Sequence, residues 1–186
     1  MEVPWIEWAY YVTLVCELLL LGCLVWSLIY PGQRIWPPPG RRSWQFWMAW
    51  VLTLLAWIGY NIVFFSYFDT SQATLSLRLW TGIPLLVLGA GLALWGVYSL
   101  GTINSLGIKG QLIDRGAYRF SRNPQYTGDA LLITGMMILC GSERFLLMGC
   151  IAALCFVIAP FTEEPWLQAE YGQPYITYKK KVRRFL

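Results

Sequence analysis

Three apolar stretches in the first hundred residues are each long enough to cross a lipid bilayer as a helix. They cover residues 9–30, 44–68 and 79–100, and the only charge in the first is Glu17. A span needs about 20 apolar residues to cross a hydrocarbon core about 30 Å thick. Only 13% of the 186 residues are charged, whereas soluble domains carry about 25%. We therefore expect one all-α, integral membrane domain covering residues 1–186.

Two shorter apolar runs follow, residues 125–140 and 145–161. Each is at or below the roughly 17-residue minimum for a span, but together with their turn they are long enough for two passes at about 1.5 Å per residue. We expect a tight helical hairpin, which gives about five transmembrane helices; a single bent span and a re-entrant hairpin are the alternatives. Residues 162–180 place aromatic side chains at helical spacing before a basic end, which predicts a C-terminal helix in the cytosol.

The basic residues predict the orientation of the chain. All but two of the 14 Lys and Arg residues lie in residues 31–42, 109–128 and 162–186; the exceptions are Arg78 and Arg144. Five spans bring those three segments to one side of the membrane. The positive-inside rule then places them, with the C-terminus, in the cytosol, and the N-terminus outside.

The composition also argues against several kinds of site. The chain has no histidine, and its five cysteines lie in apolar runs without a C-x-x-C pair. We therefore expect neither a metal site nor a thiol–imidazole nucleophile. The basic residues border the spans rather than forming a separate domain, so we expect contact with membrane lipids and no nucleic-acid partner.

Residues 109–128 form the one long polar, Gly- and Arg-rich segment of the chain. Its glycines allow a backbone to approach a ligand closely, and Asn123-Pro124 predicts a turn before the next apolar run. In a helical hairpin, the start of the fourth span and the end of the fifth are neighbours. The Asn123–Tyr126 segment should therefore lie close to Glu163 and Glu164, beside the cytosolic surface.

Two sequence blocks around the hairpin resemble isoprenylcysteine carboxyl methyltransferases. The run GAYRFSRNPQYTG, residues 116–128, is similar to their G-x-Y-x-x-x-R-H-P-x-Y-x-G stretch. The second block is similar to their E-E-x-x-L…F-G-x-x-Y-x-x-Y-x-x-x-V ending, through Glu163, Glu164, Leu167, Tyr171, Gly172, Tyr175, Tyr178 and Val182. The first half of the chain matches only as apolar spans.

Two positions depart from that pattern. Asn123 replaces the histidine, and Ala159 stands where the carboxyl methyltransferases carry an arginine that is expected to meet the substrate carboxylate. By contrast, the N-P-x-Y-x-G and E-E-P sequences resemble those of phosphatidylethanolamine N-methyltransferases. The resemblance is thus to the shared superfamily of membrane methyltransferases, with lipid-amine character.

The resemblance implies S-adenosylmethionine as cofactor, bound on the cytosolic side by the last two spans, the preceding loop and the C-terminal helix. It implies a lipophilic acceptor from the bilayer, namely a lipid amine, a thiol or an isoprenylcysteine-like carboxylate. The implied cofactor-binding residues are Leu112, Ile113, Gly116, Tyr118, Asn123, Pro124, Tyr126, Glu163 and Glu164. The implied catalytic residues are Arg122, Asn123, Tyr126 and Glu164, with Asp129 as a substrate contact.

Several of these residues also have plainer interpretations. Arg122 serves either the site or the membrane topology, and Glu17 either has a function or pairs inside the bundle with a group such as Asn61. Tyr171, Tyr175 and Tyr178 are expected to be packing and interface residues. The alternative functions are a sterol-reductase-like membrane enzyme and a non-catalytic scaffold or small transporter, in which the basic segment only sets topology.

Overall fold

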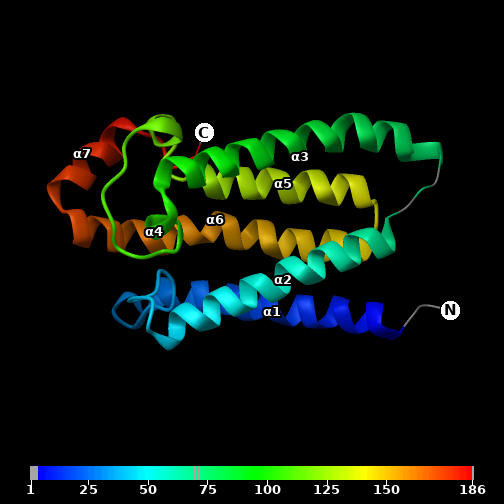
Figure 1. Ribbon diagram of the computed structural model, residues 1–186, viewed down its shortest axis with the longest axis horizontal. Helices are drawn as coiled ribbons and strands as arrows, with labels where there is room; N and C mark the ends of the chain where they lie inside the picture. The colour runs from blue at the N-terminus through cyan, green and yellow to red at the C-terminus, as the bar shows by residue number, and fades with distance from the viewer. Residues whose placement is uncertain (1–3, 69, 71, 186) are drawn as a thin grey trace.

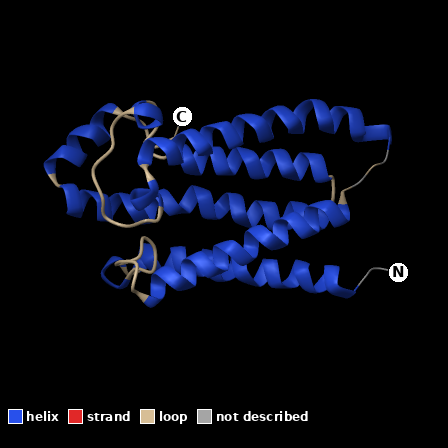
Figure 2. Ribbon diagram, in the orientation of Figure 1, coloured by secondary structure: helices blue, strands red, loops and turns tan. Residues whose placement is uncertain are grey.

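The chain folds into a bundle of helices that run nearly side by side (Figure 1). The computed structural model describes residues 4–68, 70 and 72–185, and of residues 72 and 73 only the backbone. The long helices are α1 (Pro4–Ile29), α2 (Trp44–Tyr67), α3 (Gln72–Leu100), α5 (Pro124–Cys140) and α6 (Glu143–Tyr171). The short elements are η1 (Pro31–Gln33), α4 (Thr102–Ser105), η2 (Gly116–Arg119) and α7 (Gln173–Lys181). The described residues contain no strand (Figure 2), which confirms the all-α prediction.

Four helices have the length and hydropathy of membrane spans: α1, α2, the Thr74–Leu100 part of α3, and α6. Their outer faces expose large apolar side chains such as Leu54 and Leu88, as lipid-facing surfaces do. Helix α5 has 17 residues, about 26 Å at 1.5 Å per residue, and lies between α3 and α6 (Figure 1). The chain is therefore a multi-pass membrane protein in which the shortest long helix is enclosed by its neighbours.

Helices α5 and α6 form the predicted hairpin. Gly141, in the left-handed conformation with φ of 69°, ends α5, and its N–H donates to the carbonyl oxygen of Met137. Helix α6 then runs without a break to Tyr171, so residues 162–171 extend the last span instead of starting a new helix. Gly172, with φ of 60°, is the first residue that ends the helix. The expected C-terminal helix over residues 162–180 is thus the end of α6 followed by α7.

The helices pack in the spatial order α3, α5, α6, α1, α2. Segments 30–43 and 101–123 and helix α7 gather at one end of the bundle (Figure 1), which we call the loop end. The three basic segments of the sequence therefore meet at one end, as expected from five antiparallel helices. The α5–α6 turn, the end of α2 and the start of α3 lie at the opposite end.

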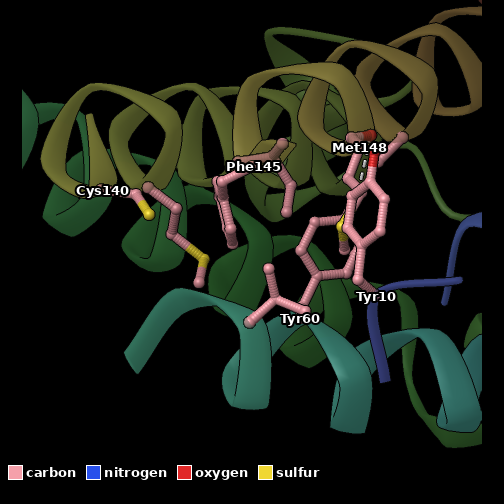
Figure 3. Close-up of a cluster of buried hydrophobic side chains, with 9 residues drawn as sticks. Tyr10, Tyr60, Cys140, Phe145 and Met148 are labelled. Carbon is pink, nitrogen blue, oxygen red and sulfur yellow. Dashed lines mark hydrogen bonds between the residues drawn. The ribbon is translucent and has the colours of Figure 1, made fainter. Parts of the chain in front are cut away.

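A core of buried side chains lies toward the α5–α6 turn, and Figure 3 shows it in close-up. Tyr60 of α2 stacks edge-on against Phe145 of α6, with ring centroids 5.5 Å apart. The Tyr60 hydroxyl donates a 2.8 Å hydrogen bond to the backbone oxygen of Met148. The remaining members of this core are Tyr10, Val63, Ile133, Met136, Cys140 and Ala152. The core joins α1 and α2 to α5 and α6. A site between these helices therefore has to lie between the core and the loop end.

Candidate functional site

A cavity of about 340 Å³ lies between the α1–α2 pair and helices α5 and α6. Residues 104–118 and helix α7 contribute to its lining at the loop end. Tyr60, Ile133 and Ala152 belong both to the core and to the cavity lining, so the core forms the cavity floor. Its volume falls in the range of small-molecule sites, about 300–1,000 Å³.

Most of the residues predicted for the site line this cavity. They are Leu112, Ile113, Tyr118, Arg122, Asn123, Tyr126, Asp129 and Glu163. Gly116 instead packs against α3, where a Cβ would come 2.4 Å from Oγ of Ser99. Pro124 is buried as the first residue of α5, and Glu164 lies outside the cavity lining.

Glu163 is the carboxylate at the loop end of the cavity. Its Oε1 accepts hydrogen bonds from the Tyr126 hydroxyl and, at 2.7 Å, from Nε1 of Trp36. The same Trp36 nitrogen lies 3.0 Å from the Tyr126 hydroxyl oxygen. Helix α5, helix α6 and the loop after α1 thus meet at one oxygen atom. The adjacency of Tyr126 and Glu163 is what the hairpin predicted.

Glu164 points into a cluster of cations on the other side of α6. Arg184 binds it with two hydrogen bonds, Nε to Oε1 at 2.8 Å and Nη2 to Oε2 at 2.9 Å. Nη2 of Arg122 lies 3.0 Å from Oε1, and Nζ of Lys179 lies 3.7 Å from Oε2. The carboxylate is 2% exposed. Both of its oxygens are therefore already paired within the protein, which leaves Glu163 as the acidic residue of the pair that faces the cavity.

Asn123 fixes the C-terminal segment onto the loop. Its Nδ2 donates to the backbone oxygen of Arg184 at 3.1 Å, and Oγ of Ser121 donates to the same oxygen at 3.2 Å. The backbone N–H of Arg122 donates to the backbone oxygen of Arg183 at 2.8 Å. Asn123 thus lines the cavity while its amide holds a neighbouring backbone in place.

Two buried donors at the cavity have no hydrogen-bond partner among the described residues: Nε of Arg122 and the hydroxyl of Tyr175. Tyr175 is 1% exposed, and burial raises the pKa of its phenol. The phenol therefore stays protonated at neutral pH and remains a donor. Unpaired buried donors are costly, so an oxygen atom of a ligand is the natural partner for both.

Three residues that matter for the chemistry of this cavity, Trp36, Tyr175 and Glu17, were not among the residues predicted for the cofactor or the substrate. Trp36 lies in a Pro-rich loop whose arginines only indicated topology, and its distance in sequence from Glu163 hid the contact. Tyr175 was expected to pack, yet its hydroxyl is unpartnered. Glu17 does not pair with Asn61, whose amide donates to the backbone oxygen of Trp57; it lines the cavity instead. An ionisable residue inside a span was the one available signal for Glu17.

Among the described residues, no cluster of His, Cys, Asp and Glu is arranged to hold a metal ion. The sequence model of the family "Phospholipid methyltransferase" matches residues 77–174. This range includes all of α5 and α6, most of α3, and the loop between α3 and α5. No curated protein and no solved structure matches the chain. The matched range is more than half of the chain and contains the first sequence block and the second block as far as Gly172. The protein therefore belongs to the phospholipid methyltransferase family of membrane methyltransferases.

Proposed function

We propose that the protein transfers a methyl group from S-adenosylmethionine to a lipophilic amine that reaches the cavity from the bilayer. The observation that carries the proposal is the set of polar groups at the loop end. Glu163, Tyr126 and Arg122, all from the family-matched range, line one apolar-walled cavity together with the free hydroxyl of Tyr175.

These groups fit the cofactor. S-adenosylmethionine carries a carboxylate, an ammonium group and two ribose hydroxyls. Nε of Arg122 and the Tyr175 hydroxyl would hold the carboxylate, because both are buried donors that have no partner within the described part of the chain. Glu163 would accept hydrogen bonds from the ribose or the ammonium. The side chains of Leu112 and Ile113, which also line the cavity, would contact the adenine.

When bound, S-adenosylmethionine supplies a methyl group on a sulfonium; a nitrogen–carbon bond forms as the carbon–sulfur bond breaks, and the bonding electrons stay on sulfur. The protein then needs to align the acceptor and exclude water rather than provide a nucleophile. A protonated amine must first lose its proton. Asp129 lines the cavity, so its carboxylate is the proposed proton acceptor.

The charges of the cavity favour an amine over a carboxylate as acceptor. Asp129 and Glu163 line it, and Arg122, whose guanidinium already pairs with Glu164, is its only Lys or Arg among the described residues. The position of the arginine expected for carboxylate recognition is Ala159, which lines the cavity without any charge. By the positive-inside rule, the loop end and the C-terminus are cytosolic and the N-terminus is outside.

Titration of detergent-purified protein with S-adenosylhomocysteine tests the cofactor site. We expect binding to the native protein and at least tenfold weaker binding to Glu163→Gln. Glu143→Gln is the matched control, because Glu143 is exposed at the opposite end of the same helix. Absence of binding to the folded native protein, or equal weakening in both variants, would contradict the site. Transfer of a radioactive methyl group into lipid extracts then tests the reaction, which a scaffold would not catalyse.

A further inference from the structure

Glu17 is a buried carboxylate near the middle of α1. It lies 12 residues before the end of that helix at Ile29, which is about 18 Å along the helix axis. It is 2% exposed, and neither of its oxygens has a hydrogen-bond partner among the described residues. An acid without a partner inside a membrane bundle is costly. Of the described side chains, that of Tyr60 interacts with Glu17, but the Tyr60 hydroxyl donates its hydrogen to a backbone oxygen.

Aromatic side chains surround Glu17, and the only Lys or Arg among the described residues that line the cavity is Arg122. Trp57, Tyr60 and Phe156 line the same cavity as Glu17, and the rings of Trp57 and Tyr60 are 6.4 Å apart between centroids. The Tyr60 hydroxyl donates its hydrogen bond to the backbone oxygen of Met148 and not to Glu17. Because Tyr60 also belongs to the cavity floor, this is the deep end of the cavity, away from Glu163.

We propose that Glu17 is the counter-ion for the nitrogen of the methyl acceptor, in a subsite that it shares with these aromatic side chains. A carboxylate together with aromatic faces is the chemistry that recognises an ammonium group, since the charge pairs with the acid and the alkyl groups lie against the rings. This subsite rests on the proposed function. Glu17, Trp57 and Tyr60 lie outside residues 77–174, the range matched by the family, whereas Phe156 of α6 lies inside it.

The same charges define the class of acceptor. Because none of the described residues at the deep end is a Lys or Arg, an anionic group next to the nitrogen would be buried beside Glu17 without a partner. The subsite therefore takes a long-chain amine that has no phosphate near its nitrogen. A phosphoethanolamine head group carries its phosphate two carbons from the nitrogen and is the less suitable ligand.

Equilibrium binding of dodecylamine to the full-length protein in detergent tests the subsite directly. We expect Glu17→Gln, which keeps the shape but loses the charge, to weaken dodecylamine binding at least tenfold and to leave S-adenosylhomocysteine binding within twofold. Cys16→Ala is the control, because Cys16 is buried next to Glu17 in the same helix and does not line the cavity. It should change neither affinity. Dodecylphosphoethanolamine should bind the native protein at least tenfold more weakly than dodecylamine.

Each result has a separate meaning. Equal dodecylamine binding by native protein and Glu17→Gln, or no dodecylamine binding at all, would overturn the subsite. Equal binding of dodecylamine and dodecylphosphoethanolamine would overturn the class of acceptor. If dodecylamine binding depends on Glu17 but S-adenosylhomocysteine does not bind, the amine subsite stands and the proposed methyl transfer fails.

Discussion

Replacing Gly128 by alanine should destabilise the bundle through a backbone collision. A Cβ at Gly128 would lie 2.3 Å from the backbone nitrogen of Ala93 and 2.7 Å from the backbone oxygen of Gly89, both in α3. Ordinary contact begins at 3.4 Å, so the shortfall of 3.4 Å less 2.3 Å is about 1.1 Å. Overpacking costs about 1–3 kcal/mol. Because backbone atoms cannot rotate away, we expect about 3 kcal/mol, less up to about 1 kcal/mol for the better helix propensity of alanine.

The net loss of about 2 kcal/mol corresponds to a fall in Tm of about 4–8 °C for a chain of this size. Thermal unfolding of the detergent-purified protein, followed by tryptophan fluorescence, measures it. Gly91→Ala is the matched control, because nothing lies within 4 Å of a Cβ at that position of α3. A Tm for Gly128→Ala no lower than that of Gly91→Ala would refute the close backbone packing. The glycine of the N-P-x-Y-x-G block would then need another explanation.

Three further changes separate ligand binding from stability. Tyr175→Phe removes a hydroxyl that has no partner among the described residues, so we expect an unchanged Tm and about tenfold weaker binding of S-adenosylhomocysteine by titration; a lowered Tm would show that the hydroxyl has a structural role. Trp36→Phe removes the donor to Glu163, a charge-assisted bond of about 1.5–3 kcal/mol, and should weaken the same binding about tenfold; unchanged affinity would argue against Glu163 as a ligand contact. Glu164→Gln leaves the buried Arg122 and the partly exposed Arg184 and Lys179 without their carboxylate. We expect a cost of about 2–4 kcal/mol once this partial exposure is considered, so the Tm should fall clearly more than it does in Glu143→Gln.

The bundle followed closely from the sequence because hydropathy reports span length directly. The short run at residues 125–140 was the difficult element, since alone it does not reach the length of an ordinary span. The apolar run that follows it, residues 145–161, made the prediction possible. A glycine-containing turn between two apolar runs predicts two packed helices, and α5 and α6 pack in this way. The extension of α6 to Tyr171 was missed because an apolar pattern ends at the membrane surface, whereas a helix ends where its backbone can turn, here at Gly172.

The sequence alone could not show that Glu163 faces the cavity while Glu164 pairs with arginines outside it. Consecutive residues of an α-helix point about 100° apart, so only one of two adjacent acids can face a given cavity. Which one does so depends on the rotation of α6 about its axis. The rotation observed turns Glu163 toward Tyr126 and Trp36, and Glu164 toward Arg122 and Arg184.

The two ends of the cavity depend on different parts of the chain. The family-matched residues 77–174 supply the polar groups of α5, α6 and the loop at one end. Helices α1 and α2 supply Glu17, Trp57 and Tyr60 at the deep end, which they share with side chains of α5 and α6. Helix α2 is held on one side by the Tyr60 bond to α6, and on the other by Nε1 of Trp50, which donates to the backbone oxygen of Leu106 at 3.4 Å. Substitutions that face the cavity from the first two helices would therefore change its width and charge while the Tyr126–Glu163 contact stays in place. Acceptor choice can diverge within such a fold without any change to the motifs that identify the family.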